Sequence, residues 1–123
     1  MVAAVAEAVP EPSGDGVVAW LDEVLDGLAA GVAVCALPAE LQGVADATRV
    51  DRISRLERVK AAAAAMLAAE TVRFAQSQVA EQLAQDVHPE KIGRGIADQV
   101  ALACRVSPSE GSRRLGLARA WWF

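Results

Sequence analysis

The 123-residue sequence is short of the residues that build β-sheets. It has no tyrosine, two phenylalanines and few threonines, and no long run in which apolar and polar residues alternate. Strands of globular proteins are rich in β-branched and aromatic residues with that alternation. The composition therefore predicts an all-α protein. Its core should be thin, because much of the 54% hydrophobic content is alanine, which buries little area per residue.

Cysteine, histidine and asparagine are also scarce. The two cysteines, Cys35 and Cys104, lie far apart with no Cys-x-x-Cys pair, His88 is the only histidine, and asparagine is absent. These counts exclude a disulfide framework and a zinc site built from cysteine and histidine. We expect two buried thiols in a reducing compartment, a solvent-exposed His88 in a loop, and no cofactor or metal.

Long hydrophobic runs are absent as well. The longest, 28–37 and 61–69, fall short of the roughly 20 residues that a membrane-spanning helix needs. The first seven residues carry no positively charged side chain of the kind that opens a secretory signal. From these observations we expect a cytoplasmic protein with no membrane partner.

Basic residues are missing from the first part of the chain. Residues 1–48 hold eight acidic side chains and no lysine or arginine. Residues 49–123 hold eight acidic and all twelve basic side chains, a net charge of +4. The overall charge of −4 argues against the whole chain as a nucleic-acid binder, but the basic part keeps weak nucleic-acid binding open.

What the sequence does contain is helical periodicity. Apolar residues spaced at i, i+4, i+7 and i+11 predict a first helix over about 15–30, capped by Asp15 and ended by Gly31. A short second helix is expected over 38–45, with Leu41 facing inward. Before them, two prolines and a glycine make residues 1–14 a predicted flexible tail. We expect the remainder, residues 15–123, to form one helical domain.

The longest predicted helix begins at a capping-box-like Thr48-Arg-Val-Asp51 and meets no glycine or proline before about Gln85. Its roughly 37 residues would form a rod of about 55 Å, which is longer than a compact domain of this size. Arginines at positions 49, 52, 55 and 58 follow its apolar side. The rod needs a covering helix, either the first helix folded back or another chain, and we expect a homodimer through it.

Two shorter helices complete the prediction. One is expected over about 96–105, and the last begins at Ser107-Pro-Ser-Glu110, which has serine at the N-cap, proline at the first helical position and glutamate at the third. The predicted fold is a small helical bundle with one long central helix and a C-terminal helix-turn-helix-like pair.

The C-terminal third carries a resemblance to a known family. Gly93-Arg-Gly95, an alanine-rich helix, Arg105-Val-Ser-Pro108 and then Gly-Ser-Arg-Arg-Leu-Gly-Leu-Ala-Arg-Ala over 111–120 resemble the actinobacterial 13E12 repeat family. The resemblance covers roughly residues 48–120. It implies a helical domain of unknown function that commonly precedes an HNH endonuclease domain, and it carries over no catalytic residue. Because the sequence stops at Trp121-Trp122-Phe123, we expect an incomplete, truncated N-terminal module.

The chain itself does not carry the residues of a nuclease. An HNH site uses histidines to bind a metal and activate water, usually with an asparagine to orient the base, and one histidine without any asparagine cannot supply this. No nucleophile elbow or phosphate-binding loop is present. We therefore expect a protein that is not an enzyme.

The helix pair around Val106-Ser-Pro108 suggests where DNA would be touched. Small residues on its first helix and the Ser-Pro start of its second are typical of a helix-turn-helix, although an arginine stands where a turn glycine is usual and a glycine stands where the second helix wants an apolar anchor. Basic side chains near the pair could reach phosphates. The candidate nucleic-acid contacts are Arg94, Arg105, Arg113, Arg114 and Arg119.

Two functional hypotheses follow. The first is a non-catalytic helical module of an HNH-endonuclease-associated protein, with weak DNA or partner binding at most. The alternative is a stand-alone interaction protein that dimerises through its long helix and has no nucleic-acid role.

Overall fold

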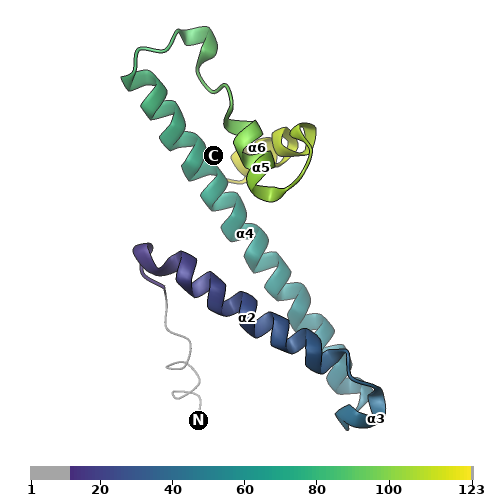
Figure 1. The fold of residues 1–123 in the computed structure, drawn as a ribbon. Helices are drawn as coiled ribbons and strands as arrows, with labels where there is room; N and C mark the ends of the chain where they lie inside the picture. Colours follow the sequence, from purple (N-terminus) through teal and green to yellow (C-terminus); the bar gives the residue numbers. More distant parts are fainter. Residues whose placement is uncertain (1–11, 123) are drawn as a thin grey trace. The chain divides into compact units, whose positions relative to one another are not determined.

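A computed structural model describes residues 12–122, including every side chain except those of Asp15 and Trp122. Figure 1 shows a fold made of helices, with no strand among the described residues. The all-α prediction is confirmed, together with the long helix and the C-terminal helices. None of the helices within this range combines the length and apolar character that a membrane span requires.

The chain divides into two compact units, Met1–Arg49 and Val50–Phe123. The helix α4 (Asp46–Ala84) begins in the first unit and continues in the second. The prediction of one domain over 15–123 stays a prediction. Most of the predicted flexible tail, residues 1–11, lies outside the described residues, and Gly14 already belongs to a short 3-10 helix, η1 (Gly14–Gly16).

The first unit consists of η1, α2 (Val17–Cys35), α3 (Ala39–Gln42) and the first residues of α4. The N-cap position of α2 is held by Gly16, and the expected cap by the Asp15 side chain lies outside the described residues. The expected stop at Gly31 is wrong. That glycine adopts no positive φ, so it continues the helix, and α2 ends at Cys35 shortly before Pro38, where helices commonly stop.

The connection after α2 is held together by one glutamine. Gln42 donates hydrogen bonds to the carbonyl oxygens of Cys35 at 3.1 Å and Leu37 at 2.6 Å. Gly43, with φ of 65°, ends α3, because glycine adopts this conformation without a side-chain clash. The prediction that Leu41 faces inward is wrong, since 69% of it is exposed.

The second unit contains most of α4, the 3-10 helix η2 (Pro89–Lys91), α5 (Ile96–Cys104) and α6 (Pro108–Trp122). Because α4 starts at Asp46, Thr48 lies in its first turn, and the predicted capping box at Thr48 is wrong. The core gathers Ala75 of α4, Ile96 of α5 and Leu115 of α6, with Phe74 and Val79 packed against them. The second half of α4 therefore supports the helix pair α5–α6.

Three smaller expectations can be checked against this fold. His88 is exposed, and its Nδ1 accepts a hydrogen bond from the backbone N–H of Glu90 at 3.2 Å, which agrees with a solvent-exposed loop histidine. The expectation of two buried thiols is wrong for Cys35, which is exposed at the end of α2. Cys104 is only partly buried.

Candidate binding cleft

The turn between α5 and α6 contains Arg105, whose backbone has the left-handed conformation. Arg105 has φ of 55°, the conformation that usually favours glycine after a helix. Its N–H donates to the carbonyl of Leu102 at 3.2 Å, and the N–H of Val106 donates to that of Ala101 at 3.0 Å. These two bonds form the Schellman arrangement and satisfy the last carbonyls of α5.

The start of α6 is capped as its sequence predicts. The Ser107 Oγ accepts a hydrogen bond from the backbone N–H of Glu110 at 3.2 Å, and Pro108 takes the first helical position. The second half of a capping box, from the glutamate back to the cap residue, is replaced by ion pairs along the helix. Glu110 Oε1 accepts from Arg113 at 2.6 Å and from Arg114 at 3.1 Å.

These ion pairs change the acidity of Glu110. Hydrogen bonds first from Arg113 and then from Arg114 lower the pKa of this carboxyl from 4.5 to about 2, because they stabilise its charged form. In return, the carboxylate raises the pKa of both arginines. Glu110 thus places one negative charge between two of the positive side chains that were expected to contact phosphate.

Gly111 lets α5 and α6 approach closely. A Cβ added at this buried glycine would lie 2.6 Å from both the Cβ of Ala101 and the carbonyl oxygen of Ala97. Real contacts are not that short, so any side chain at Gly111 would force the two helices apart. The glycine that is unusual for the second helix of a DNA reader is therefore explained by packing within this pair.

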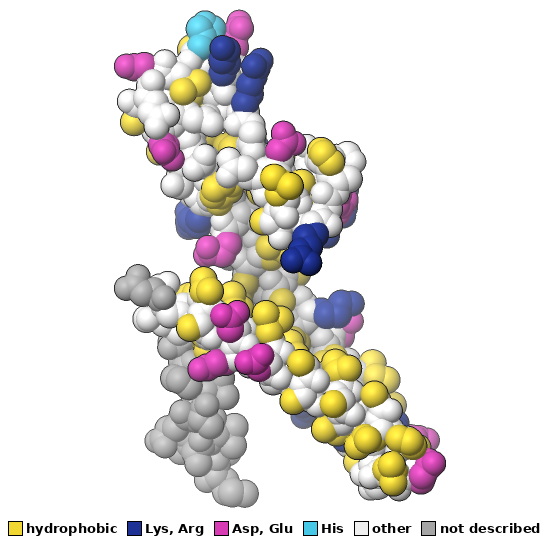
Figure 2. All heavy atoms as spheres, viewed as in Figure 1, with side chains coloured by type: hydrophobic (Ala, Val, Ile, Leu, Met, Phe, Trp, Pro, Cys, Tyr) yellow, Lys and Arg dark blue, Asp and Glu magenta, His cyan; other side chains and the backbone are white. Residues whose placement is uncertain are grey.

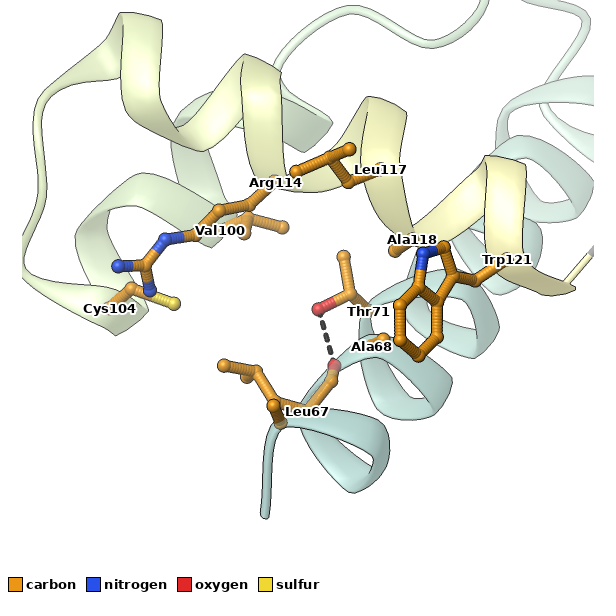
Figure 3. Close-up of a pocket in the computed structure, with 10 residues that line it drawn as sticks. Leu67, Ala68, Thr71, Val100, Cys104, Arg114, Leu117, Ala118 and Trp121 are labelled. Atoms are coloured by element: carbon orange, nitrogen blue, oxygen red, sulfur yellow. Dashed lines mark hydrogen bonds between the residues drawn. The ribbon is translucent and has the colours of Figure 1, made fainter. Parts of the chain in front are cut away.

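An apolar cleft opens beside this pair, against the second half of α4 (Figure 3). It has a volume of about 490 Å³. Among its polar groups, Thr71 donates from Oγ1 to the carbonyl of Leu67 at 2.7 Å, and Arg114 donates from Nε to Glu110 at 3.1 Å. Its lining residues come from three helices: Ala64, Leu67, Ala68, Thr71, Val100, Cys104, Arg114, Leu117, Ala118 and Trp121.

The lining of this cleft is largely apolar. The only charged side chain in its lining is Arg114, and no general base or nucleophile–base pair stands beside it. Across residues 12–122 there is no group of three or more histidine, cysteine, aspartate or glutamate side chains that could hold a metal ion. Large apolar residues at its mouth, Leu117 at 50% and Trp121 at 75% exposure, instead provide area that a partner could cover.

The five predicted nucleic-acid contacts have different environments. Arg113 and Arg114 bind Glu110, and Arg114 also lines the cleft. Arg105 is exposed at the α5–α6 turn, Arg94 is exposed before α5, and Arg119 is exposed near the end of α6. On α6 the three arginines project in three directions, since each residue advances about 100° around a helix. Their role in DNA contact stays a prediction.

Comparison with known proteins adds no relative: no family model, no curated protein and no solved structure matches this chain.

Sequence reasoning did not find the cleft. Its main apolar residues lie far apart in the sequence, with Leu67 on α4, Val100 on α5 and Leu117 and Trp121 on α6. A signal was present in the spacing of Leu117 and Trp121, four residues apart and therefore on one face of α6. The sequence does not show that this face of α6 and Leu67 of α4 border the same cleft.

Proposed function

We propose that this chain is a non-catalytic helical module that binds another polypeptide, and that its partner is a second copy of itself. The resemblance to the 13E12 repeat family adds the proposal that such a module belongs to an HNH-endonuclease-associated protein. The observation that carries the self-association is the amount of large apolar surface left uncovered on two helices.

The first uncovered surface lies on α2. None of its 19 residues is buried, and Figure 2 shows hydrophobic side chains gathered over this helix beside acidic ones. Five large apolar side chains fall on one face at helical spacing. We call them the α2 stripe: Val18 (73% exposed), Leu21 (38%), Leu25 (62%), Leu28 (39%) and Val32 (67%).

The second uncovered surface lies on the first half of α4. We call it the α4 stripe: Val50 (64% exposed), Ile53 (67%), Leu56 (47%) and Val59 (42%). A spacing of three residues moves each side chain about 60° around the helix relative to the one before. The four therefore sweep about half of the circumference, which is more than one straight partner helix covers. Two partner helices are needed to cover the α4 stripe, and a second copy of the chain supplies them.

Charge favours pairing between unlike surfaces. The α2 stripe is bordered by Asp22 and Asp26, in a part of the chain that has no basic residue. The α4 stripe is accompanied by Arg52, Arg55 and Arg58. Contact between an acidic and a basic surface speeds encounter and selects the partner. Burying apolar area at about 25 cal/mol per Å² then supplies most of the affinity.

Weak DNA binding is the second candidate, carried by the net charge of +4 on residues 49–123. The Glu110 ion pairs weaken this candidate because they occupy Arg113 and Arg114. Binding by the remaining arginines would depend on phosphate contacts, so it should fall steeply with salt and ignore sequence. Duplex titrations at low and physiological salt test it, and a complex selective for one sequence at physiological salt would contradict this ranking.

Sedimentation velocity tests self-association. At micromolar concentration we expect a dimer for the unaltered chain and a monomer for Leu56→Glu, which places a charge in the α4 stripe. Ser77→Glu is the matched control, because it adds the same charge at an exposed position of α4 outside the stripe. A compact monomer for the unaltered chain at every concentration would refute the proposal.

A further inference from the structure

We propose that the cleft among α4, α5 and α6 is the docking site for α2 of a second copy of this chain. The proposal rests on the self-association proposed above and adds the surface that receives α2. The mouth of the cleft is a third uncovered apolar surface, in addition to the α2 stripe and the α4 stripe described above.

The shapes of the two surfaces fit each other. The lining of the cleft includes the small residues Ala64, Ala68 and Ala118, which let another helix approach closely. Leu67, Leu117 and Trp121 border it with 46%, 50% and 75% of their surfaces exposed. A row of leucines and valines such as the α2 stripe is the kind of ridge that a hydrophobic groove accepts in helix-in-groove recognition.

The charges of the two surfaces also fit. The cleft lining has one charged side chain, the cation Arg114, which is paired with Glu110. Lys60 stands one turn before Ala64 on α4. Helix α2 carries three acidic residues, all within its first ten positions, and no basic one. An acidic apolar helix is thus the occupant that this lining favours over a basic one.

Chain length favours a second copy over the chain's own α2. The cleft begins at Ala64, 18 residues after the start of α4, which is about 27 Å along the helix. The 19 residues of α2 span about 28 Å. Because Gln42 ties the connection to the end of α2, an α2 folded back along its own α4 would reach only the near edge of the cleft. A second copy has no such limit.

The two native cysteines provide a direct test. Cys35 ends α2 and is exposed, and Cys104 lines the cleft. We would prepare Cys35→Ser and Cys104→Ser variants of the full chain and treat each alone, and their mixture, with a short bismaleimide. Only the mixture can form a Cys35–Cys104 link between copies, so we expect a covalent dimer at least about tenfold more abundant in the mixture than in either variant alone.

A second readout does not depend on thiol chemistry. Leu117→Glu places a charge at the cleft mouth and should weaken dimerisation at least tenfold in sedimentation. Leu102→Glu is the matched control, since Leu102 is 78% exposed on α5 and does not line the cleft. Circular dichroism of both variants would show that they keep their helices.

The outcomes separate the two proposals. If the unaltered chain sediments as a monomer, self-association itself fails. If it is dimeric but Leu117→Glu and Leu102→Glu behave alike and the mixture gives no covalent dimer, docking in the cleft alone is overturned. A cross-linked monomer of the unaltered chain, without a dimer in the mixture, would assign the cleft to the chain's own α2 and also overturn it.

Discussion

The two units of the chain use apolar residues in opposite ways. In the first unit, α2 is rich in leucine and valine, and none of its residues is buried. In the second unit, apolar residues of similar kinds are buried: Val72, Ala75 and Ile96 are each less than 5% exposed. The comparison teaches that apolar content alone does not make a core. A core needs elements that can approach one another, and α5 and α6 achieve this through a tight turn and a glycine contact.

The largest expected loss of stability in the second unit comes from adding a side chain at Gly111. Gly111→Ala should lower the free energy of unfolding by about 3 kcal/mol, because the new methyl group would meet a backbone carbonyl that cannot move aside. Urea denaturation measures the effect. Gly116→Ala on the same helix is the control. It meets nothing within 4 Å, so it should gain up to about 1 kcal/mol from helix propensity. Equal effects at the two glycines would contradict the close packing.

Amide hydrogen exchange sharpens the comparison without any mutation. At low protein concentration we expect amides of Val100, Ala101 and Leu115 to be protected about 100-fold more than those in the middle of α2, since protection follows buried contacts. If α2 docks on a second copy, its protection should rise with protein concentration while that of α5 stays constant. Protection of α2 that equals that of α5 at every dilution would show that α2 is covered within a single chain.

A smaller effect is expected at the start of α6. Ser107→Ala removes the acceptor of the Glu110 N–H and should cost about 1 kcal/mol of unfolding free energy in thermal denaturation. Ser112→Ala is the matched control at an exposed position inside the same helix, and it should change stability by no more than a few tenths of a kcal/mol. A neutral Ser107→Ala would mean that the cap does not stabilise the pair.

The smallest effect is the pH dependence of the second unit. The pKa of Glu110 lies at about 2 in the folded chain, below its ordinary 4.5. A lowered pKa means that the charged form stabilises the fold above pH 4.5, and that this contribution is lost as pH falls from 4.5 toward 2. The melting temperature of the unaltered chain should therefore drop through this window more than that of Glu110→Gln. Parallel curves for the two proteins would contradict the ion pairs.

Much of this fold could be predicted from the sequence, because helix boundaries depend on local chemistry. The Ser107-Pro108 start of α6 and the absence of glycine and proline in α4 are read from a few neighbouring residues. The errors came where a local signal had two meanings. Gly31 can end a helix or continue it, and Thr48 can cap a helix or lie in its first turn.

The candidate site could be predicted less well than the helices. The sequence predicts phosphate contacts for Arg113 and Arg114, yet Glu110 stands three and four residues before them, the spacing at which a carboxylate and a cation meet on one helix. The cleft depends on how three helices meet, and no spacing within one helix encodes that. Gly111 shows the same limit: its partner Ala101 lies on another helix.

The left-handed Arg105 has a consequence for how this sequence can change. A non-glycine residue in this conformation costs roughly 1 kcal/mol relative to glycine, and the chain meets that cost whenever it folds. Glycine, and to a lesser degree asparagine, would take the same backbone position with less strain. A library randomised at this codon and selected for heat resistance should therefore become enriched in both. A single substitution at the exposed Arg105 can therefore make the α5–α6 turn more stable.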